Sequence, residues 1–282
     1  MLNDYITFEE TEQNMQLKTM SQTAKAHPKV GEYNKNKYGT LMTIMEYFNY
    51  NNITIMFTTQ LSTGEIYSFI KYNQSYQNFK KGELKSPYDC TAYGIGYLGV
   101  GPYTKSECKK YYSTWQNMLT RCYNEKSLEI RPGYRGCYVD PFFHNFQNFC
   151  YWCDMNYYEV PGETMCLDKD ILYYNNNVYG PMTCVFVPQT INKLFTYDKS
   201  SRQIGNPVGV SYHADRNKKY EACCSINGKN TGLGFFYDKM QAFAVYKEAK
   251  EKEIKRIAEQ YRPYIPELLY YRMINYIVIP DR

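Results

Sequence analysis

Asp168, Lys169 and Asp170 stand together in the tract LDKDI and bring metal-binding and phosphate-binding chemistry to one point of the chain. A carboxylate can hold Mg²⁺, and a lysine ammonium can steady a phosphate. Neither group replaces an imidazole as a general base near neutral pH. Of the three histidines, only His144, beside the aromatic run HNFQNF, is placed to join a central site. A single histidine among aromatic residues is more often a packed side chain than a catalyst.

The pair Cys150 and Cys153 has the spacing of zinc ligands, in the motif CYWC. Cys137, Cys166 and Cys184 offer further thiols. A structural zinc needs four ligands, usually as two close pairs, and a second close pair is absent from the sequence. We therefore expect the ten cysteines to be mostly reduced thiols packed in the protein, without a bound metal or other cofactor.

The elements that precede these residues begin with a small β-unit. Leu41–Tyr47 and Ile53–Phe57 are joined by the turn-forming sequence NYNN, and a third apolar run covers Ile66–Ile70. Residues 1–35 are polar with scattered apolar positions. We expect them to form an arm that becomes ordered only against a partner or a neighbouring subunit.

Two helices and a glycine-rich segment lead to the LDKDI tract. The segment YGIGYLGVGPY is predicted to be a loop, because a phosphate-binding glycine loop needs a preceding apolar strand and a following GK[ST] helix. Residues 111–126 place Trp115 and Leu119 at helical spacing, with Ser113 as a possible N-cap. A second helix is predicted over Phe146–Met155.

Two segments complete the pattern. Residues 167–195 indicate a strand, a polar turn, a second strand and a short helix. From Gly209 the sequence indicates a three-stranded antiparallel sheet followed by a long amphipathic helix, which Pro263 ends. The fold class is therefore α+β, with these parts in order: an arm at 1–35, a β-unit at 36–90, a core at 91–200, a sheet–helix domain at 201–262 and an apolar tail at 263–282. The tail docks either on the chain's own body or on a partner.

Composition limits the classes of function. The net charge is only +5, whereas a dedicated DNA binder concentrates basic charge on one face. The 33 tyrosines suit protein interfaces, since tyrosine packs its ring and still hydrogen-bonds; a low-GC genome produces the same bias. No apolar run reaches the roughly 20 residues of a membrane span, and the N-terminus lacks a signal-peptide pattern. We therefore expect a cytoplasmic protein.

A series of segments in one order resembles a family of bacteriophage proteins that join an HNH-endonuclease-like core to an Apetala-type DNA-binding domain. These segments are VGEYNKNKYGTLMTIMEYFNYNNITIMF, FKKGELKSPY, YGIGYLGVG, TWQNMLTRCYNEK, GCYV, HNFQNF, LDKDI, TCVFVPQTIN and the sheet that begins GVSY. The resemblance implies a ββα-metal core, in which a hairpin and a helix hold one divalent ion, a histidine activates water and an asparagine orients that histidine.

This chain departs from the family pattern in two places. In related nucleases the segment matching LDKDI carries the general-base histidine, and here it has none. Relatives also show Cys-x-x-Cys and Trp where this chain has GCYVDPFF. Cys137 is retained, but Asp140 and Phe143 stand where the second cysteine and the tryptophan would be. The resemblance therefore implies a degenerate HNH-like core.

The C-terminal sheet resembles domains that lay three strands in the major groove of DNA. Glu221, Cys223 and Cys224 lie where a DNA reader would gain from more hydrogen-bond donors, so a DNA-reading face and an ordinary interaction module both stay open. The DNA-binding candidates are His213, Arg216, Lys218, Lys219, Tyr220 and Lys229.

Three functions fit these observations: a homing-type nuclease, a DNA-binding protein without catalysis, and a scaffold recruited to bind another protein. Phages encode inhibitors of bacterial defence complexes, and this chain also resembles the anti-Gabija group of them, which implies a host defence complex as partner. The third function is favoured because it accounts for five features together: the missing base, the modest charge, the tyrosines, the polar arm and the apolar tail. We expect a non-enzymatic homo-oligomer in the cytoplasm of an infected bacterium, with DNA binding still possible; the alternative is a DNA-binding homing-endonuclease-like protein.

Overall fold

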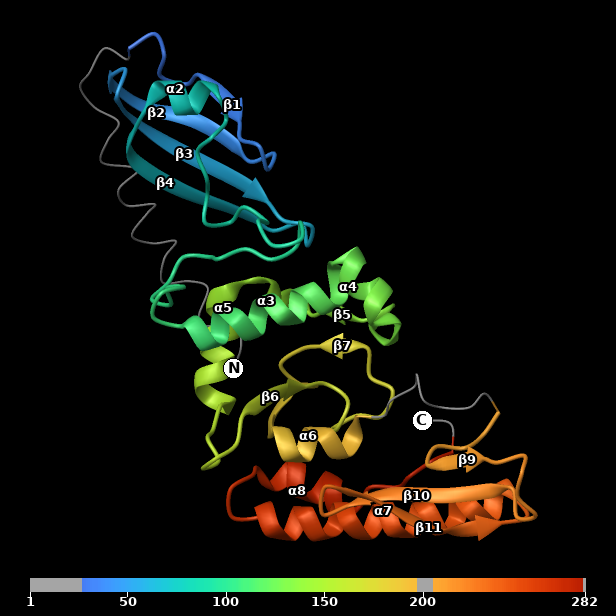
Figure 1. Ribbon diagram of the computed structural model, residues 1–282. Helices are drawn as coiled ribbons and strands as arrows, with labels where there is room; N and C mark the ends of the chain where they lie inside the picture. The colour runs from blue at the N-terminus through green and yellow to red at the C-terminus, as the bar shows by residue number, and fades with distance from the viewer. Residues whose placement is uncertain (1–26, 197–204, 281–282) are drawn as a thin grey trace. The chain divides into compact units, whose positions relative to one another are not determined.

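The computed structural model describes residues 27–196 and 205–280. The chain divides into two compact units, residues 1–89 and residues 90–282, and each is described by itself (Figure 1). The architecture is mixed α+β, as the sequence predicts.

The first unit is built on a four-stranded antiparallel sheet in the order β1–β2–β3–β4. Its strands are β1 (Tyr33–Lys35), β2 (Leu41–Asn49), β3 (Asn52–Gln60) and β4 (Ile66–Gln74). The three predicted strands are present, and each is longer than the apolar run that predicts it. The sequence places β1 in the arm, whereas the structure pairs it with β2. Its polar side chains give no apolar signal because the strand is held through its backbone. The arm before His27 lies outside the described residues.

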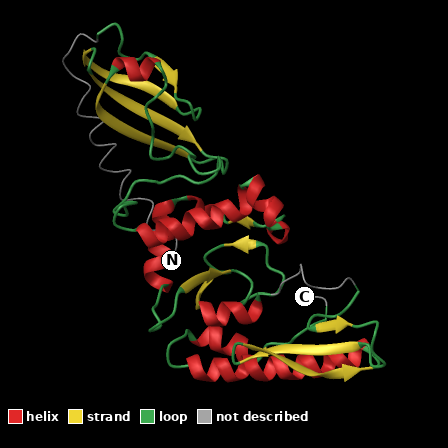
Figure 2. Cartoon of the chain, viewed as in Figure 1, coloured by secondary structure: helices red, strands yellow, loops and turns green. Residues whose placement is uncertain are grey.

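A short helix, α2 (Tyr76–Lys80), covers one face of this sheet (Figure 2). Ser75 begins the helix, since its hydroxyl accepts a hydrogen bond from the Gln77 amide at 3.2 Å. Phe79 is fully buried under the helix. It packs with the alternate side chains of the central strands, namely Met42, Ile44, Ile53, Ile55 and Phe57, and with Leu84.

A buried carboxylate fastens the end of the first unit to its sheet. Asp89 is 1% exposed. One of its oxygens accepts from the Thr40 hydroxyl at 2.6 Å, and the other accepts from the Asn36 side-chain amide and the Ser86 backbone amide, both at 2.8 Å. These bonds join the β1–β2 connection to the segment that follows α2.

The second unit begins with helices around an aromatic core. They are α3 (Lys109–Tyr123), α4 (Glu125–Ile130), the 3₁₀ helices η1 (Pro132–Tyr134) and η2 (Pro141–His144), and α5 (Phe146–Asn156). The predicted buried face of α3, with Trp115 and Leu119, is confirmed. The helix begins after Cys108, so Ser113 lies inside it and the predicted N-cap is wrong. Asn124 ends α3 and caps α4, accepting from the Ser127 amide at 2.9 Å.

The glycine-rich segment is a loop, as predicted, and two of its glycines allow it to approach the helices closely. A Cβ on Gly96 would lie 2.6 Å from the Leu119 side chain, and a Cβ on Gly99 would lie 2.2 Å from the Asn145 side-chain oxygen. Gly99 also has a φ of +70°. Larger residues at these positions would push the loop away from α3 and from the start of α5.

The LDKDI tract lies at the end of a hairpin that leads into a helix. Strand β6 (Met165–Asp168) pairs antiparallel with β8 (Val185–Pro188), and α6 (Gln189–Phe195) follows directly. This is the predicted order of strand, turn, strand and helix. The connection between β6 and β8 carries β7 (Val178–Tyr179), which pairs in parallel with β5 (Tyr138–Val139). That pairing joins the tract to the helical part of the unit.

A three-stranded antiparallel sheet and a long helix close the second unit, as predicted. The strands β9 (Val210–Tyr212), β10 (Tyr220–Ile226) and β11 (Lys229–Phe236) lie in the order β11–β10–β9. Helix α7 (Lys239–Tyr261) packs on one face of this sheet through a core that includes Ala222, Cys224, Ala242 and Phe243. Asp238 caps α7, accepting from the amides of Met240 and Gln241.

The C-terminal tail docks on its own chain, which decides between the two alternatives that the sequence leaves open. Helix α8 (Glu267–Ile274) buries Leu269 and Met273 in a cluster with residues of α6 and α7. Further on, the Val278 amide donates to Glu251 at 2.9 Å, and Lys247 donates to the Val278 carbonyl at 3.1 Å. Within the described ranges, no helix is both long and apolar enough to cross a membrane.

Candidate functional site

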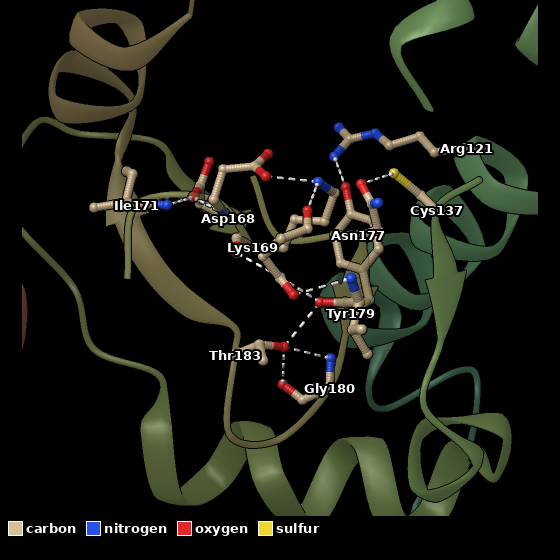
Figure 3. A network of polar contacts seen from close by, with 12 residues as sticks. Arg121, Cys137, Asp168, Lys169, Ile171, Asn177, Tyr179, Gly180 and Thr183 are labelled. Carbon is tan, nitrogen blue, oxygen red and sulfur yellow. Dashed lines mark hydrogen bonds and ion pairs between the residues drawn. The ribbon is translucent and has the colours of Figure 1, made fainter. Parts of the chain in front are cut away.

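Asp168 ends β6 and fastens the turn that follows it. Its Oδ1 accepts hydrogen bonds from the backbone amides of Asp170 and Ile171, both at 2.7 Å (Figure 3). Burial raises the pKa of Asp168 above its ordinary value, against these two bonds, which favour the ionised form. One carboxylate oxygen is therefore committed to the local fold.

Lys169 points inward and is 5% exposed. Its Nζ lies 2.7 Å from Asp170 Oδ1 and 2.6 Å from the Asn176 carbonyl oxygen. Burial by itself lowers the pKa of Lys169, but the hydrogen bond and negative charge of Asp170 outweigh it, so the pKa is raised overall. The side chain therefore stays a cation near neutral pH and cannot accept a proton from water.

Asn176 closes the connection in which this lysine lies. Its side-chain amide donates to the carbonyls of Lys169 and Val178, both at 2.7 Å, and its oxygen accepts from the Val178 amide at 3.1 Å. Sequence reasoning treats this stretch only as a polar turn. The run of three asparagines at positions 175–177 was the available signal, since asparagine side chains hydrogen-bond to nearby backbone in turns.

Tyr179, which is 2% exposed, lies between two cations. The Arg121 guanidinium lies 3.5 Å from the Tyr179 hydroxyl, and Lys169 Nζ lies 5.8 Å from the centre of the tyrosine ring. Cys137 borders the same network, with its sulfur 3.9 Å from Asn177 Oδ1 (Figure 3). Arg121 and Asn177 are absent from the sequence-based candidates. Together the side chains can attract an anion, although Lys169 is already satisfied by Asp170 and Asn176.

The structure does not bring His144 to this tract. Its Nε2 lies 2.9 Å from the Val139 carbonyl oxygen, and no hydrogen bond joins its ring to residues 168–170 within the part of the chain described. Burial lowers the pKa of His144 despite the carbonyl contact. His144 is therefore a neutral, packed side chain near pH 7.

Asp140 and Phe143 both have structural roles in the fold. Asp140 caps η2, accepting from the Phe142 amide at 2.9 Å. Phe143 is fully buried, and its carbonyl accepts from the Trp115 indole at 2.7 Å. Both residues stabilise the aromatic core.

The cysteines of the CYWC pair pack into that core. Cys150 and Cys153 are both 0% exposed. Burial raises the pKa of each thiol, and it raises the pKa of Cys122 and Cys184 to about 12. All ten cysteines lie among the described residues, and none of them forms a disulfide. In residues 27–196 and 205–280, no three His, Cys, Asp or Glu side chains are arranged to hold a metal ion.

The DNA-binding candidates divide between different surfaces of the C-terminal sheet. His213 and Arg216 lie on the face opposite α7, where the His213 ring is 5.7 Å and the Arg216 guanidinium 4.2 Å from the Phe235 ring centre. Tyr220 instead packs against the core under α7, because it alternates with Glu221 along β10. Its predicted place on the DNA-reading face is therefore wrong.

The three candidate lysines lie at the margins of the sheet. The Lys218 ammonium lies 5.6 Å from the centre of the Tyr237 ring. The Lys219 backbone carbonyl accepts a hydrogen bond from the His213 amide. Lys229 is the first residue of β11. Glu221 lies on the open face near the start of the central strand β10, with its carboxylate 2.8 Å from His213 Nε2. A carboxylate at that place repels phosphate and accepts, rather than donates, hydrogen bonds.

Comparisons with protein-family models, with curated proteins and with solved structures find no match to this chain.

Proposed function

We propose that this chain is a non-catalytic binding protein on a degenerate HNH-like scaffold. The order β6–β8–α6 supports the scaffold, because a ββα-metal core also has a hairpin followed by a helix. Asn176 supports it as well, since it holds the backbone of Lys169 as an asparagine orients the base in such cores. Lys169, the buried cation at the centre of the tract that carries the base in the family, is the observation on which the proposal rests.

The proposed activity is inhibition of a bacterial anti-phage defence complex by direct binding, as a homo-oligomer in the cytoplasm of the infected host. Exposed tyrosines in both units support a protein partner. Tyrosine is enriched at protein interfaces, whose centres contain few charged residues. Tyr50, Tyr174, Tyr237 and Tyr271 are each more than half exposed. The Gabija system is the proposed target, on the resemblance given above.

The test combines phage protection with capture. The chain is expressed in bacteria that carry a defence system, plaques are counted, and the tagged chain is captured with its partner. We expect restored plaque formation and capture of a defence protein. Asp168→Asn, whose amide oxygen can still accept the two backbone bonds, should inhibit as well as the original protein. Inhibition that is lost in this folded variant would argue for catalysis.

The second candidate is a DNA-binding protein of the homing-endonuclease type. Arg216, Lys218 and Lys219 near the open face of the C-terminal sheet favour it. Its DNA affinity should fall steeply with salt, because lysines that neutralise phosphates release counterions. The double change Lys218→Glu and Lys219→Glu should then abolish binding.

A further inference from the structure

Among the described residues, strand β4 forms one edge of the N-terminal sheet (Figure 1). It has nine residues, Ile66–Gln74, whereas β1 at the opposite edge has three. Within the described residues, β3 is the one strand that pairs with it. An edge strand presents backbone amides and carbonyls that remain free to pair with another chain.

The sequence of β4 lacks the features that usually prevent such pairing. It contains no proline, and Lys71 is its one charged residue. Side chains alternate between the two faces of a strand, so Lys71 lies on the same face as Phe69, which packs toward the core. Lys71 is therefore not on the outward face. The outward face carries Ile66, which is 66% exposed, and Tyr72, which is 48% exposed. A long, partly apolar edge with a single charge is a template for strand addition.

We propose that β4 pairs with β4 of a second copy of this chain, antiparallel and about a two-fold axis at Phe69. The regular part of the strand supports this register. It runs from Ile66 to Tyr72, because Asn73 has a φ of +56° and the pairing with β3 shifts beside it. Phe69 is the middle residue of that segment. A two-fold axis there uses the whole regular segment of both copies.

This register is self-complementary in side chains and in charge. It places Ile66 opposite Tyr72 of the second copy, so the two exposed apolar residues of each strand cover those of the other. Lys71 falls opposite Tyr67 of the second copy rather than opposite another lysine. Like charges therefore do not meet. The inference rests on the proposed homo-oligomer and names one of its interfaces.

Self-association of the full chain tests the edge first. Sedimentation velocity should show a dimer or a larger even-numbered assembly. The double change Ile66→Lys and Tyr72→Lys should weaken that association at least tenfold, because it places four lysines across the paired strands. The matched control is Ile130→Lys with Met182→Lys, at two apolar positions of the second unit that are 80% and 78% exposed. The control should associate as the unchanged protein does.

Disulfide trapping tests the register itself and does not depend on the stability of the lysine variant. Residues 1–89 contain no cysteine. In the proposed pairing, Ser68→Cys lies opposite Ile70→Cys of the second copy, so mild oxidation with oxidised glutathione should link them, as peptide mapping can show. Ser68→Cys alone should not link, because two residues at this position lie diagonally apart, beyond the roughly 7 Å limit for a disulfide.

The outcomes separate this inference from the proposed function. An oligomer that survives the lysine changes and gives no link between positions 68 and 70 overturns the edge pairing and leaves the proposed oligomer intact. A monomeric unchanged protein overturns both, while the capture and plaque tests still judge the binding function. A disulfide from position 70 to a host protein would show that a host protein, and not a second copy of this chain, pairs with β4.

Discussion

Lys169 and Asn176 hold each other from both sides: the lysine Nζ lies 2.6 Å from the Asn176 carbonyl oxygen, and the Asn176 side-chain amide lies 2.7 Å from the Lys169 carbonyl oxygen. The two bonds close the connection between β6 and β7 into a rigid loop. They also fix a buried ammonium at the centre of the tract where the resembled nucleases carry a base. The loop thus has a structural reason to keep its lysine.

Lys169→Met should destabilise the second unit by about 1–3 kcal/mol, because it leaves the Asn176 carbonyl without its donor. Both tryptophans of the chain, Trp115 and Trp152, lie in this unit, so their fluorescence during urea unfolding reports on it. Lys126→Met, at an exposed position of α4, is the control and should change the unfolding free energy little. Equal midpoints for the two variants would contradict the role given to Lys169.

Asp89→Ala should destabilise the first unit by about 2–4 kcal/mol, since three buried donors lose one acceptor group. The first unit has no tryptophan, so hydrogen exchange of peptides from residues 33–74 is the suitable measurement. Protection should fall there and remain unchanged in the second unit. Glu83→Ala, an exposed acid of the same segment, should leave protection as it is.

The elements that the sequence predicts well are those whose side chains alternate or repeat against a core. The buried residues of β3, among them Ile53, Ile55 and Phe57, carry such a signal. So does the buried face of α7. β1 gives none, because only its backbone is paired. The boundary between α3 and α4 at Asn124 is also not visible in the sequence. An asparagine that ends one helix and caps the next leaves the apolar spacing unchanged.

The candidate site follows the same division. The sequence identifies the LDKDI tract but not Asn176, because which of three neighbouring asparagines closes the loop depends on the backbone around it. Tyr220 was assigned to the open face, yet strand alternation beside Glu221 turns it toward α7. One residue of register decides the face of every side chain in a strand.

Glu253 makes the second unit sensitive to acid. Hydrogen bonds from Arg256 chiefly, and from the Asn227 amide, lower the pKa of Glu253 against the effect of burial. A carboxylate with a lowered pKa stabilises the fold above its unfolded value of about 4.5 and loses that contribution as the pH falls through its folded pKa. Stability should therefore decline as the pH falls below about 4.5.

Glu253→Gln should lower the unfolding free energy at pH 7 by about 1.5–3 kcal/mol, because it removes a charge-assisted hydrogen bond. It should also flatten the decline in acid. Melting temperatures at pH 7 and at pH 4 measure both effects. Glu248→Gln, at an exposed position of the same helix, is the control and should lose stability in acid as the original protein does. If Glu253→Gln loses stability in acid just as steeply, other groups cause the acid sensitivity.

Glu221 should limit DNA binding by the C-terminal sheet. Its carboxylate lies beside His213 on the open face, where it repels phosphate. Glu221→Gln should raise DNA affinity several-fold and steepen its dependence on salt, since one repulsive charge disappears. Fluorescence anisotropy over a series of salt concentrations measures both. If Glu221→Gln and Glu248→Gln bind DNA equally, this face does not meet DNA.

The purified protein should not cleave plasmid DNA with Mg²⁺ or Mn²⁺. Cleavage needs a group that takes a proton from water. The tract offers a lysine with a raised pKa, a turn-forming Asp168 and a partly exposed Asp170 paired with that lysine, while the His144 ring contacts the Val139 carbonyl. Supercoiled plasmid incubated with each metal should remain supercoiled at every protein concentration that saturates capture of the partner. Asp168→Asn serves as the matched control for contaminating nuclease. Nicking by the original protein that disappears in this variant would show that Asp168 takes part in cleavage and would end the non-catalytic proposal.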